Sequence, residues 1–170
     1  VKGGFGMDHK SLRTDDCVEE VINEYSSTVY KLAYARTRNK SDAEDVFQEV
    51  FLRYIRKHRT FESKEHEKAW FIRVTINCCK DIWGSLFRKH TQPLEECMVV
   101  SEIDEVNQLE QFLLDLPEDY RIVIHLFYYE DMSTSQISKI LHKKESTVRV
   151  QLTRGRRLLK EIIEGAGYNA

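Results

Sequence analysis

The residues with the clearest chemical use stand near the C-terminus, where the sequence turns strongly basic. Residues 139–160 carry eight basic side chains against the single acid Glu145. Residues 94–119, by contrast, carry nine acidic side chains and no basic one. This separation of charge predicts that the C-terminal end contacts phosphate groups, with an acidic segment before it. Ordinary solvated helix faces are the plainer alternative.

The basic segment has the spacing of a DNA-binding helix-turn-helix. The pattern predicts a short helix over 133–142, a tight turn over 142–145 and a longer helix from 146 to about 164. The apolar back of the longer helix is Val148, Leu152, Gly155, Leu159 and Ile162. In that stripe, Gly155 would let the preceding helix approach closely. The opposite side carries hydroxyl and guanidinium groups that could contact bases and phosphates. An ordinary basic amphipathic helix is the alternative interpretation. The candidate DNA-binding residues here are Ser146, Thr147, Arg149, Val150, Thr153, Arg154 and Arg157.

A second candidate site lies on a helix expected from about 67 to 88. Apolar residues cover most of its circumference, which leaves one narrow strip for polar groups. That strip holds Trp70, Arg73, Asn77, Lys80 and Asp81. An aromatic ring, cations and an amide together could hold an unstacked DNA base. A central helix with one wet edge is the alternative.

The helix expected from 42 to about 58 has one residue out of place. Its buried stripe is Ala43, Val46, Phe47, Val50 and Tyr54. The opposite face is Asp45, Gln48, Glu49, Leu52 and Arg56. A leucine ringed by polar residues suits a protein-docking patch, although single exposed leucines are common.

The sequence offers little for catalysis. His66 and Glu67 begin a zincin-like pattern, but Trp70 stands where the second histidine would be. Nucleotide-binding and nucleophile-elbow motifs are missing. The four cysteines form no Cys-x-x-Cys pair, which favours reduced thiols in a cytoplasm over a zinc site. We therefore expect no catalytic residue, no metal and no cofactor.

These candidate sites require an all-α protein. With only seven Gly and two Pro in 170 residues, we expect three helices, a linker and four shorter helices. Ser41 or Asp42 would cap the second helix, with Glu44 completing a capping box. The expected units are a disordered leader with a vector-derived remnant (1–14), a helical domain (15–90), a flexible linker (91–105) and a second helical domain (106–170). No apolar run is long enough to insert into a membrane.

Three strings in this order resemble the sigma-70 family, specifically its extracytoplasmic-function (ECF) group. Asp42-Ala-Glu-Asp-Val-Phe-Gln-Glu-Val-Phe-Leu-Arg53 is similar to the region-two signature. Ala69-Trp70-Phe71-Ile72-Arg73-Val74, with Asn77 and Asp81, resembles the promoter-melting helix. Leu116-Pro117-Glu118-Asp119-Tyr120-Arg121, Ser135-Gln136-Ile137-Ser138 and Thr147-Val148-Arg149 resemble the region-four helix-turn-helix. In the turn, Lys143-Lys144 replaces the usual glycine.

The resemblance implies a sigma factor that is not an enzyme and that acts in the cytoplasm. Its partners would be core RNA polymerase (β′ clamp helices and β flap), promoter DNA and an anti-sigma factor. The face around Leu52 would dock on the clamp helices. Arg73 and Asn77, with the 58–66 loop, would hold a flipped base of the minus-ten element. The helix carrying Arg149 and Arg154 would read the minus-thirty-five element.

Two other functions remain open from the residues alone. A stand-alone helix-turn-helix regulator would bind duplex DNA specifically without polymerase. A pure interaction protein, such as an anti-sigma factor or adaptor, would show no promoter selectivity. An enzyme is a distant third.

Overall fold

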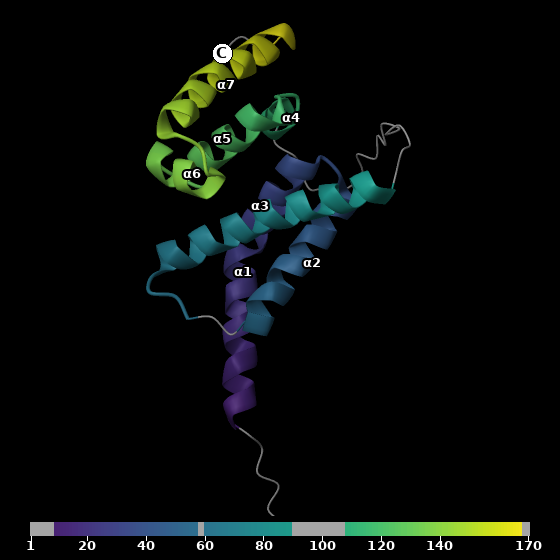
Figure 1. Ribbon diagram of the computed structural model, residues 1–170, viewed down its shortest axis with the longest axis vertical. Helices are drawn as coiled ribbons and strands as arrows, with labels where there is room; N and C mark the ends of the chain where they lie inside the picture. The colour runs from purple at the N-terminus through teal and green to yellow at the C-terminus, as the bar shows by residue number, and fades with distance from the viewer. Residues whose placement is uncertain (1–8, 58–59, 90–107, 168–170) are drawn as a thin grey trace, which may run out of the picture.

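The computed structural model describes residues 9–57, 60–89 and 108–167, which form helices and, within these ranges, no strand. The first three are α1 (His9–Thr37), α2 (Lys40–Lys57) and α3 (Lys64–Lys89). The other four are α4 (Gln108–Leu114), α5 (Glu118–Tyr128), α6 (Thr134–Leu141) and α7 (Glu145–Gly165). Figure 1 shows α1–α3 as one body and α4–α7 as a second body stacked on it. The all-α prediction with two small helical domains is confirmed.

The first body packs around aromatic rings that three helices contribute. Tyr25 of α1 stacks on Phe71 of α3 at 4.5 Å between ring centroids, and Phe51 of α2 approaches Phe71 at 5.4 Å. Val29, Val46 and Val50 are fully buried beside them. The apolar stripes expected from helical spacing therefore meet in one core, in which α3 packs against both α1 and α2.

Two local expectations for this body were wrong. α1 begins at His9, so residues 9–14 are helical instead of belonging to a disordered leader. The start of α2 is capped by Asn39, whose side-chain oxygen accepts from the Asp42 amide at 3.0 Å, while Ser41 is exposed. An Asn cap one residue before the helix gives the same N-terminal hydrogen bond that we assigned to Ser41 or Asp42. Residues 1–8 and the expected linker at 91–105 lie outside the described residues.

The second body is a helix-turn-helix supported by α4 and α5. Ile137, Val148 and Leu126 are fully buried and share one core cluster. Gly155 packs against α5, because a Cβ there would lie 3.1 Å from Ile124 and 3.2 Å from Tyr120. The helix that Gly155 admits is therefore α5, and not the immediately preceding α6 as we expected. The reason is that α7 packs more extensively on α5 than on α6.

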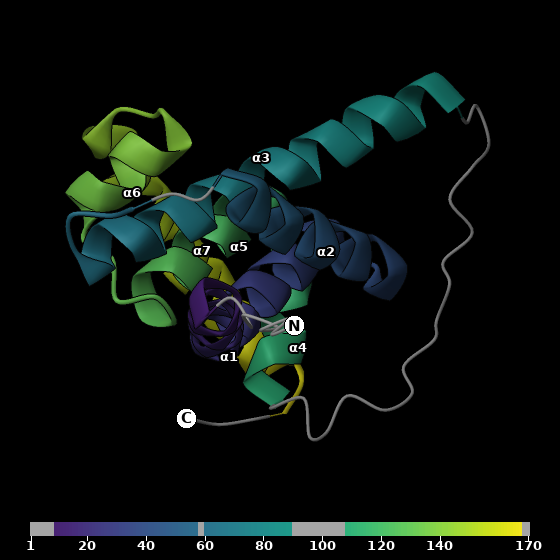
Figure 2. The same ribbon diagram turned by 90° about the horizontal axis from the view of Figure 1, so that it is seen from below.

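The two bodies touch each other through α1 with α5 and α3 with α6. Leu32, Ile72 and Ile76 of the first body belong to the core cluster of the second. Figure 1 shows α4–α7 on one side of α1 and α3, with α2 on the side away from them. In the view from below, the helices of the second body lie mostly behind those of the first (Figure 2). The described helices include none long and apolar enough to span a bilayer.

Candidate nucleic-acid interface

The turn between α6 and α7 is fixed by local hydrogen bonds. Ser133 and Gln136 form a reciprocal capping box at the start of α6, with 3.2 Å from the Gln136 amide to Ser133 Oγ. At the other end, His142 adopts a left-handed conformation with φ 53°. Ser138 Oγ then donates to the Lys143 carbonyl at 2.7 Å. A non-glycine residue in this conformation is strained, and the contacts around it hold the turn in place.

The first turn of α7 is tied back to α6. Thr134 Oγ1 donates to Glu145 Oε1 at 2.7 Å, and the same oxygen accepts from Arg149 at 2.7 Å. The hydrogen bond from Thr134, and then that from Arg149, hold the pKa of Glu145 below its usual value. Glu145 is therefore ionised at neutral pH and orients the guanidinium of Arg149 on α7.

The outer face of α7 is open to solvent over its whole length. Val148, Leu152 and Gly155 are buried, whereas Leu159 and Ile162 are only partly buried. The seven candidate DNA-binding residues, Ser146, Thr147, Arg149, Val150, Thr153, Arg154 and Arg157, are all exposed. All seven are therefore accessible to a ligand, and their assignment to DNA stays a prediction.

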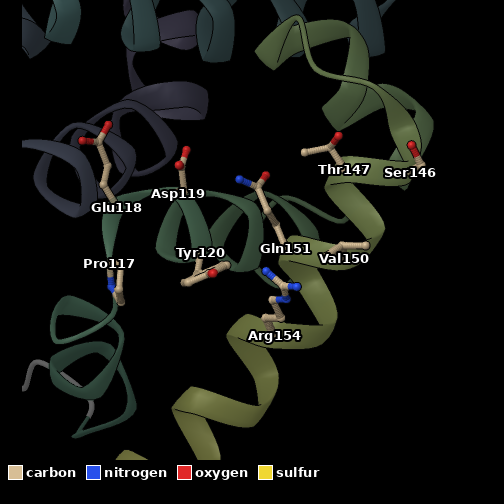
Figure 3. A pocket seen from close by; sticks show the side chains of 9 residues that line it. All are labelled: Pro117, Glu118, Asp119, Tyr120, Ser146, Thr147, Val150, Gln151 and Arg154. Atoms are coloured by element: carbon tan, nitrogen blue, oxygen red, sulfur yellow. The ribbon is translucent and has the colours of Figure 1, made fainter.

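A concave site of about 710 Å³ lies where α7 faces the start of α5. Figure 3 shows Gln151 and Arg154 projecting from α7 toward Asp119 and Tyr120 of α5. Across the described residues Arg154 makes no ion pair, so its guanidinium is available to a ligand. Lys143, in contrast, is paired with Asp119 at 2.5 Å and lies 3.4 Å from Gln151. Sequence reasoning missed Gln151, because it sits at the border between the apolar stripe and the polar face.

The polar strip of α3 is real but narrower than expected. Arg73, Asn77 and Lys80 are exposed, and Asp81 pairs with Arg53 of α2 at 3.4 Å. Trp70 is only 8% exposed, so our placement of it on the wet strip was wrong. Its indole packs 5.8 Å from the Phe61 ring and 5.9 Å from the Tyr54 ring. Trp70 lies at the edge of the strip, and its ring packs into the core together with Tyr54 and Phe61.

The outer face of α2, where the sequence predicted a docking patch, is mostly exposed. Leu52 is 42% exposed, and Asp45, Gln48 and Arg56 are exposed around it. Glu49 is partly buried because its carboxylate holds Arg53 at 2.7 Å. Ile55 is 39% exposed one turn from Leu52, and together they form an apolar patch that sequence reasoning missed. The period of the helix could have revealed it, since Ile55 also lies outside the buried stripe.

The described residues contain no group of three or more His, Cys, Asp or Glu side chains placed to hold a metal ion. Cys78 and Cys79 are free and buried. Burial raises the pKa of the Cys78 thiol to about 11 and that of Cys79 to about 12. Both thiols are therefore protonated and unreactive at neutral pH. Cys17 and Cys97 fall where no side chain is described.

Family models identify both bodies. Residues 21–91 match the model described as "Sigma-70 region 2", and residues 107–159 match "Sigma-70, region 4". The chain belongs to the sigma-70 family. Region 2 corresponds to α1–α3 and region 4 to α4–α7, and the two matches together cover most of the sequence.

Relatives of known function agree with this assignment. The chain is 26% identical to the ECF RNA polymerase sigma factor SigW of Bacillus subtilis, a match that covers 86% of this chain and 88% of SigW. It is 28% identical to SigM of the same organism, over 85% of this chain and 94% of SigM. These relatives place the chain in the ECF group of sigma factors, and the stand-alone regulator is not favoured.

Two solved structures share the fold. RpoE of Bartonella quintana, solved with the anti-sigma factor NepR, has a TM-score of 0.68 at 18% identity, and the match covers 86% of this chain and 96% of RpoE. CnrH, solved with the cytosolic domain of CnrY, has a TM-score of 0.63 at 18% identity, covering 89% of this chain and 90% of CnrH. At this identity the likeness concerns the arrangement of the helices.

Proposed function

We propose that this sigma factor binds core RNA polymerase and directs it to promoters by reading the minus-thirty-five element with α7 and melting the minus-ten element with α3. The observation that carries the proposal is the outer face of α7. Its back is locked onto α5 through Gly155, while Val150 is 48% exposed and Arg154 is unpaired among the described residues. A rigid helix with this face can enter a major groove and grip guanine through Arg154.

The remaining residues of α7 divide between bases and phosphates. Ser146 and Thr147 lie in the first turn, where free amides and hydroxyls favour a phosphate. Arg149, Val150, Thr153 and Arg154 follow the face that would meet base edges. Arg157 is 72% exposed and only loosely paired with Glu161 at 3.6 Å, which suits a backbone contact.

For promoter melting, α3 offers Arg73 and Asn77 one turn apart on an exposed strip, with Lys80 beyond them. The amide of Asn77 can donate to and accept from an extruded base, and Arg73 can neutralise the adjacent phosphate. Trp70 lies beneath the edge of this strip, where its indole packs against Tyr54 and Phe61 and would hold α3 in position. Residues 58–59 of the adjoining loop lie outside the described part.

Core polymerase would dock on the α2 patch, with Leu52 and Ile55 against apolar groups of the β′ clamp helices and Asp45, Gln48, Glu49 and Arg56 as the polar rim. A second contact, with the β flap, would use region 4. An apolar hollow of about 330 Å³ between α4, α5 and α7 supports it, with Leu113, Ile124 and Leu159 among its lining residues.

An anti-sigma factor is a further expected partner, because RpoE of Bartonella quintana, which shares this fold, was solved with the anti-sigma factor NepR. As an RNA polymerase subunit, the chain would act in the cytoplasm.

In vitro transcription tests the proposed function. Purified chain would be added to bacterial core polymerase with a library of promoter sequences, and transcripts would be sequenced. We expect transcripts from a narrow class of templates that share two spaced elements, and none without core polymerase. Tight, specific duplex binding by the chain alone, with no core-dependent transcription, would instead indicate a stand-alone regulator.

A further inference from the structure

A buried carboxylate lies where the three helices of region 2 meet near the start of α3. Glu67 is only 7% exposed. Tyr25 of α1 donates to Glu67 Oε2 at 3.2 Å, and Tyr54 of α2 donates to Oε1 at 3.4 Å. Lys64, the first residue of α3, donates to Oε2 at 3.1 Å. The two oxygens of Glu67 therefore connect α1, α2 and the beginning of α3.

Stability alone does not explain an acid at this position. The surroundings are aromatic, since the rings of Tyr25 and Tyr54 lie 4.5 and 5.2 Å from that of Phe71. An apolar side chain could fill such a place without taking a charge out of water, and exchanging buried ion pairs for apolar groups is often neutral or stabilising. Charge-assisted hydrogen bonds, on the other hand, fix the orientation of their donors. The use of Glu67 is therefore better explained by orientation.

Tyr54 extends this network to the segment that precedes α3. Its ring lies parallel to that of Phe61, with 6.4 Å between centroids and an interplanar angle of 3°. Phe61 also approaches the rings of His66 at 5.7 Å and Trp70 at 5.8 Å. Tyr25 makes no ring contact with Phe61 among the described residues. Of the two tyrosines bound to the carboxylate, Tyr54 is the one that can transmit its position to Phe61.

Phe61 lies at the end of the α3 strip that would hold an extruded base. Its neighbour His66 is exposed, and the helical period places His66 on the same side of α3 as Arg73 and Asn77. Glu67, the next residue after His66, points about 100° away around the helix. A DNA strand on the strip would thus meet Phe61, whereas Glu67 stays buried and can act only through its partners.

We propose that Glu67 is a positioning residue for promoter melting, which holds Tyr54 and thereby fixes the Phe61 ring beside the extruded base of the minus-ten element. Stacking on an aromatic ring offsets part of the cost of extrusion. The gain is largest when the ring is in place before the base arrives, because no side-chain freedom is then lost on binding. The inference rests on the proposed function for its purpose, but the order of the Phe61 ring can be measured on the chain alone.

The first test measures the Phe61 ring in the full chain without polymerase or DNA. 4-Fluorophenylalanine would be incorporated in place of Phe61, and the fluorine NMR shift compared with that of the free amino acid. Tyr54→Phe and Glu67→Gln should both move the signal toward the free value. Tyr25→Phe removes an equivalent hydroxyl from the same carboxylate, so it is the matched control and should leave the signal in place.

The second test separates promoter opening from binding. With core polymerase, time-resolved permanganate footprinting should show opening slowed about tenfold by Glu67→Gln and by Tyr54→Phe, the equivalent of one poorly stacked base. The affinities for core and for the minus-thirty-five element should not change. Tyr25→Phe should open promoters at the wild-type rate. Urea denaturation should show that the two tyrosine variants are destabilised alike, because each loses one hydrogen bond to Glu67.

A purely structural role for Glu67 predicts a different pattern, in which opening falls with stability in every variant. That pattern, or the same fluorine shift and opening rate for Tyr54→Phe and Tyr25→Phe, would overturn the proposal. The tyrosine pair keeps this comparison decisive even if Glu67→Gln does not fold. A wild type that opens no promoter would instead refute the proposed function, and the fluorine signal would still decide whether Glu67 orders Phe61.

Discussion

The two helices of this sigma factor that we propose contact DNA are built in opposite ways. α3 is the central helix of region 2, with Phe71, Ile72 and Ile76 buried on its several sides and a polar strip one or two residues wide. α7 is a peripheral helix of region 4, buried along one stripe and open over the rest of its circumference. The α3 residues proposed to contact DNA are therefore neighbours of core residues, whereas the corresponding α7 residues are separated from the core.

This difference has a physical purpose in the proposed function. A helix that holds an extruded base must keep a fixed position, because extrusion costs a few kcal/mol that only a fitted pocket returns. A helix that enters a major groove needs a broad, polar and accessible face. Substitutions in α3 should thus mix effects on stability with effects on melting, and substitutions in α7 should separate them.

The largest expected effect follows from Trp70 in α3. Trp70→Ala removes an indole that packs against three other rings, and should lower the free energy of unfolding by about 3–5 kcal/mol. Urea denaturation followed by circular dichroism measures it. Arg154→Ala on α7 is the control and should leave unfolding unchanged. A stability loss below about 1 kcal/mol for Trp70→Ala would place the indole outside the core and remove the contrast between the helices.

The next effect concerns the α2 patch. Leu52→Asp places a charge in the surface proposed to meet the clamp helices, and should weaken core binding by at least about 2 kcal/mol. The unfolding free energy should change by less than about 0.5 kcal/mol because Leu52 is already exposed. Fluorescence titration with core polymerase gives the first quantity and urea denaturation the second. Equal core affinity for wild type and Leu52→Asp would remove α2 from the polymerase contact.

On α7, Arg154→Ala should reduce minus-thirty-five binding by about 1–3 kcal/mol and relax preference at one or two base positions. Selection of randomised minus-thirty-five sequences in the presence of core polymerase measures both effects. The physical reason is the loss of a guanidinium that no other described residue engages. A uniform loss across all sequences would make Arg154 a phosphate contact only.

On α3, Asn77→Ala should reduce open-complex formation by about 1 kcal/mol at promoters with the preferred base, through loss of one hydrogen-bonded base contact. Core binding and minus-thirty-five selection should persist, and Asn77 is exposed, so stability should not change. Permanganate footprinting of the melted strand measures opening, beside a core-binding assay. Joint loss of core binding and melting would indicate that Asn77 supports the fold.

The smallest effect is expected for Lys143→Ala. The Lys143 ammonium is already paired with Asp119, so a phosphate would gain only part of its charge. Binding should weaken evenly across sequences by less than about 1 kcal/mol, with a salt slope reduced by no more than about one. A titration over several salt concentrations gives both values. A larger slope change would mean that Lys143 leaves Asp119 when DNA binds.

The sequence by itself determined the parts that depend on helical period. Val148 and Leu152 return to one side of α7, and Ala43, Val46 and Val50 to one side of α2, so the exposed faces could be assigned before any coordinates existed. The family resemblance followed from the same strings and is confirmed by the two matched regions. The positions that failed, Trp70 and the cap at Asn39, sit at borders where a single residue of phase or boundary changes the answer.

Only the tertiary structure decided which surfaces meet. Periodicity shows that Gly155 faces a neighbour but not that the neighbour is α5, because packing partners depend on contacts between residues far apart in sequence. The pairing of Lys68 with Glu130 spans 62 residues and leaves no local signal in either helix. The acidic stretch was visible as composition, but only the stacking of the two bodies brings Glu110 to Lys31 and Glu118 to Arg36. Charge and helical period are local properties of a chain, whereas the contact between two domains depends on the whole fold.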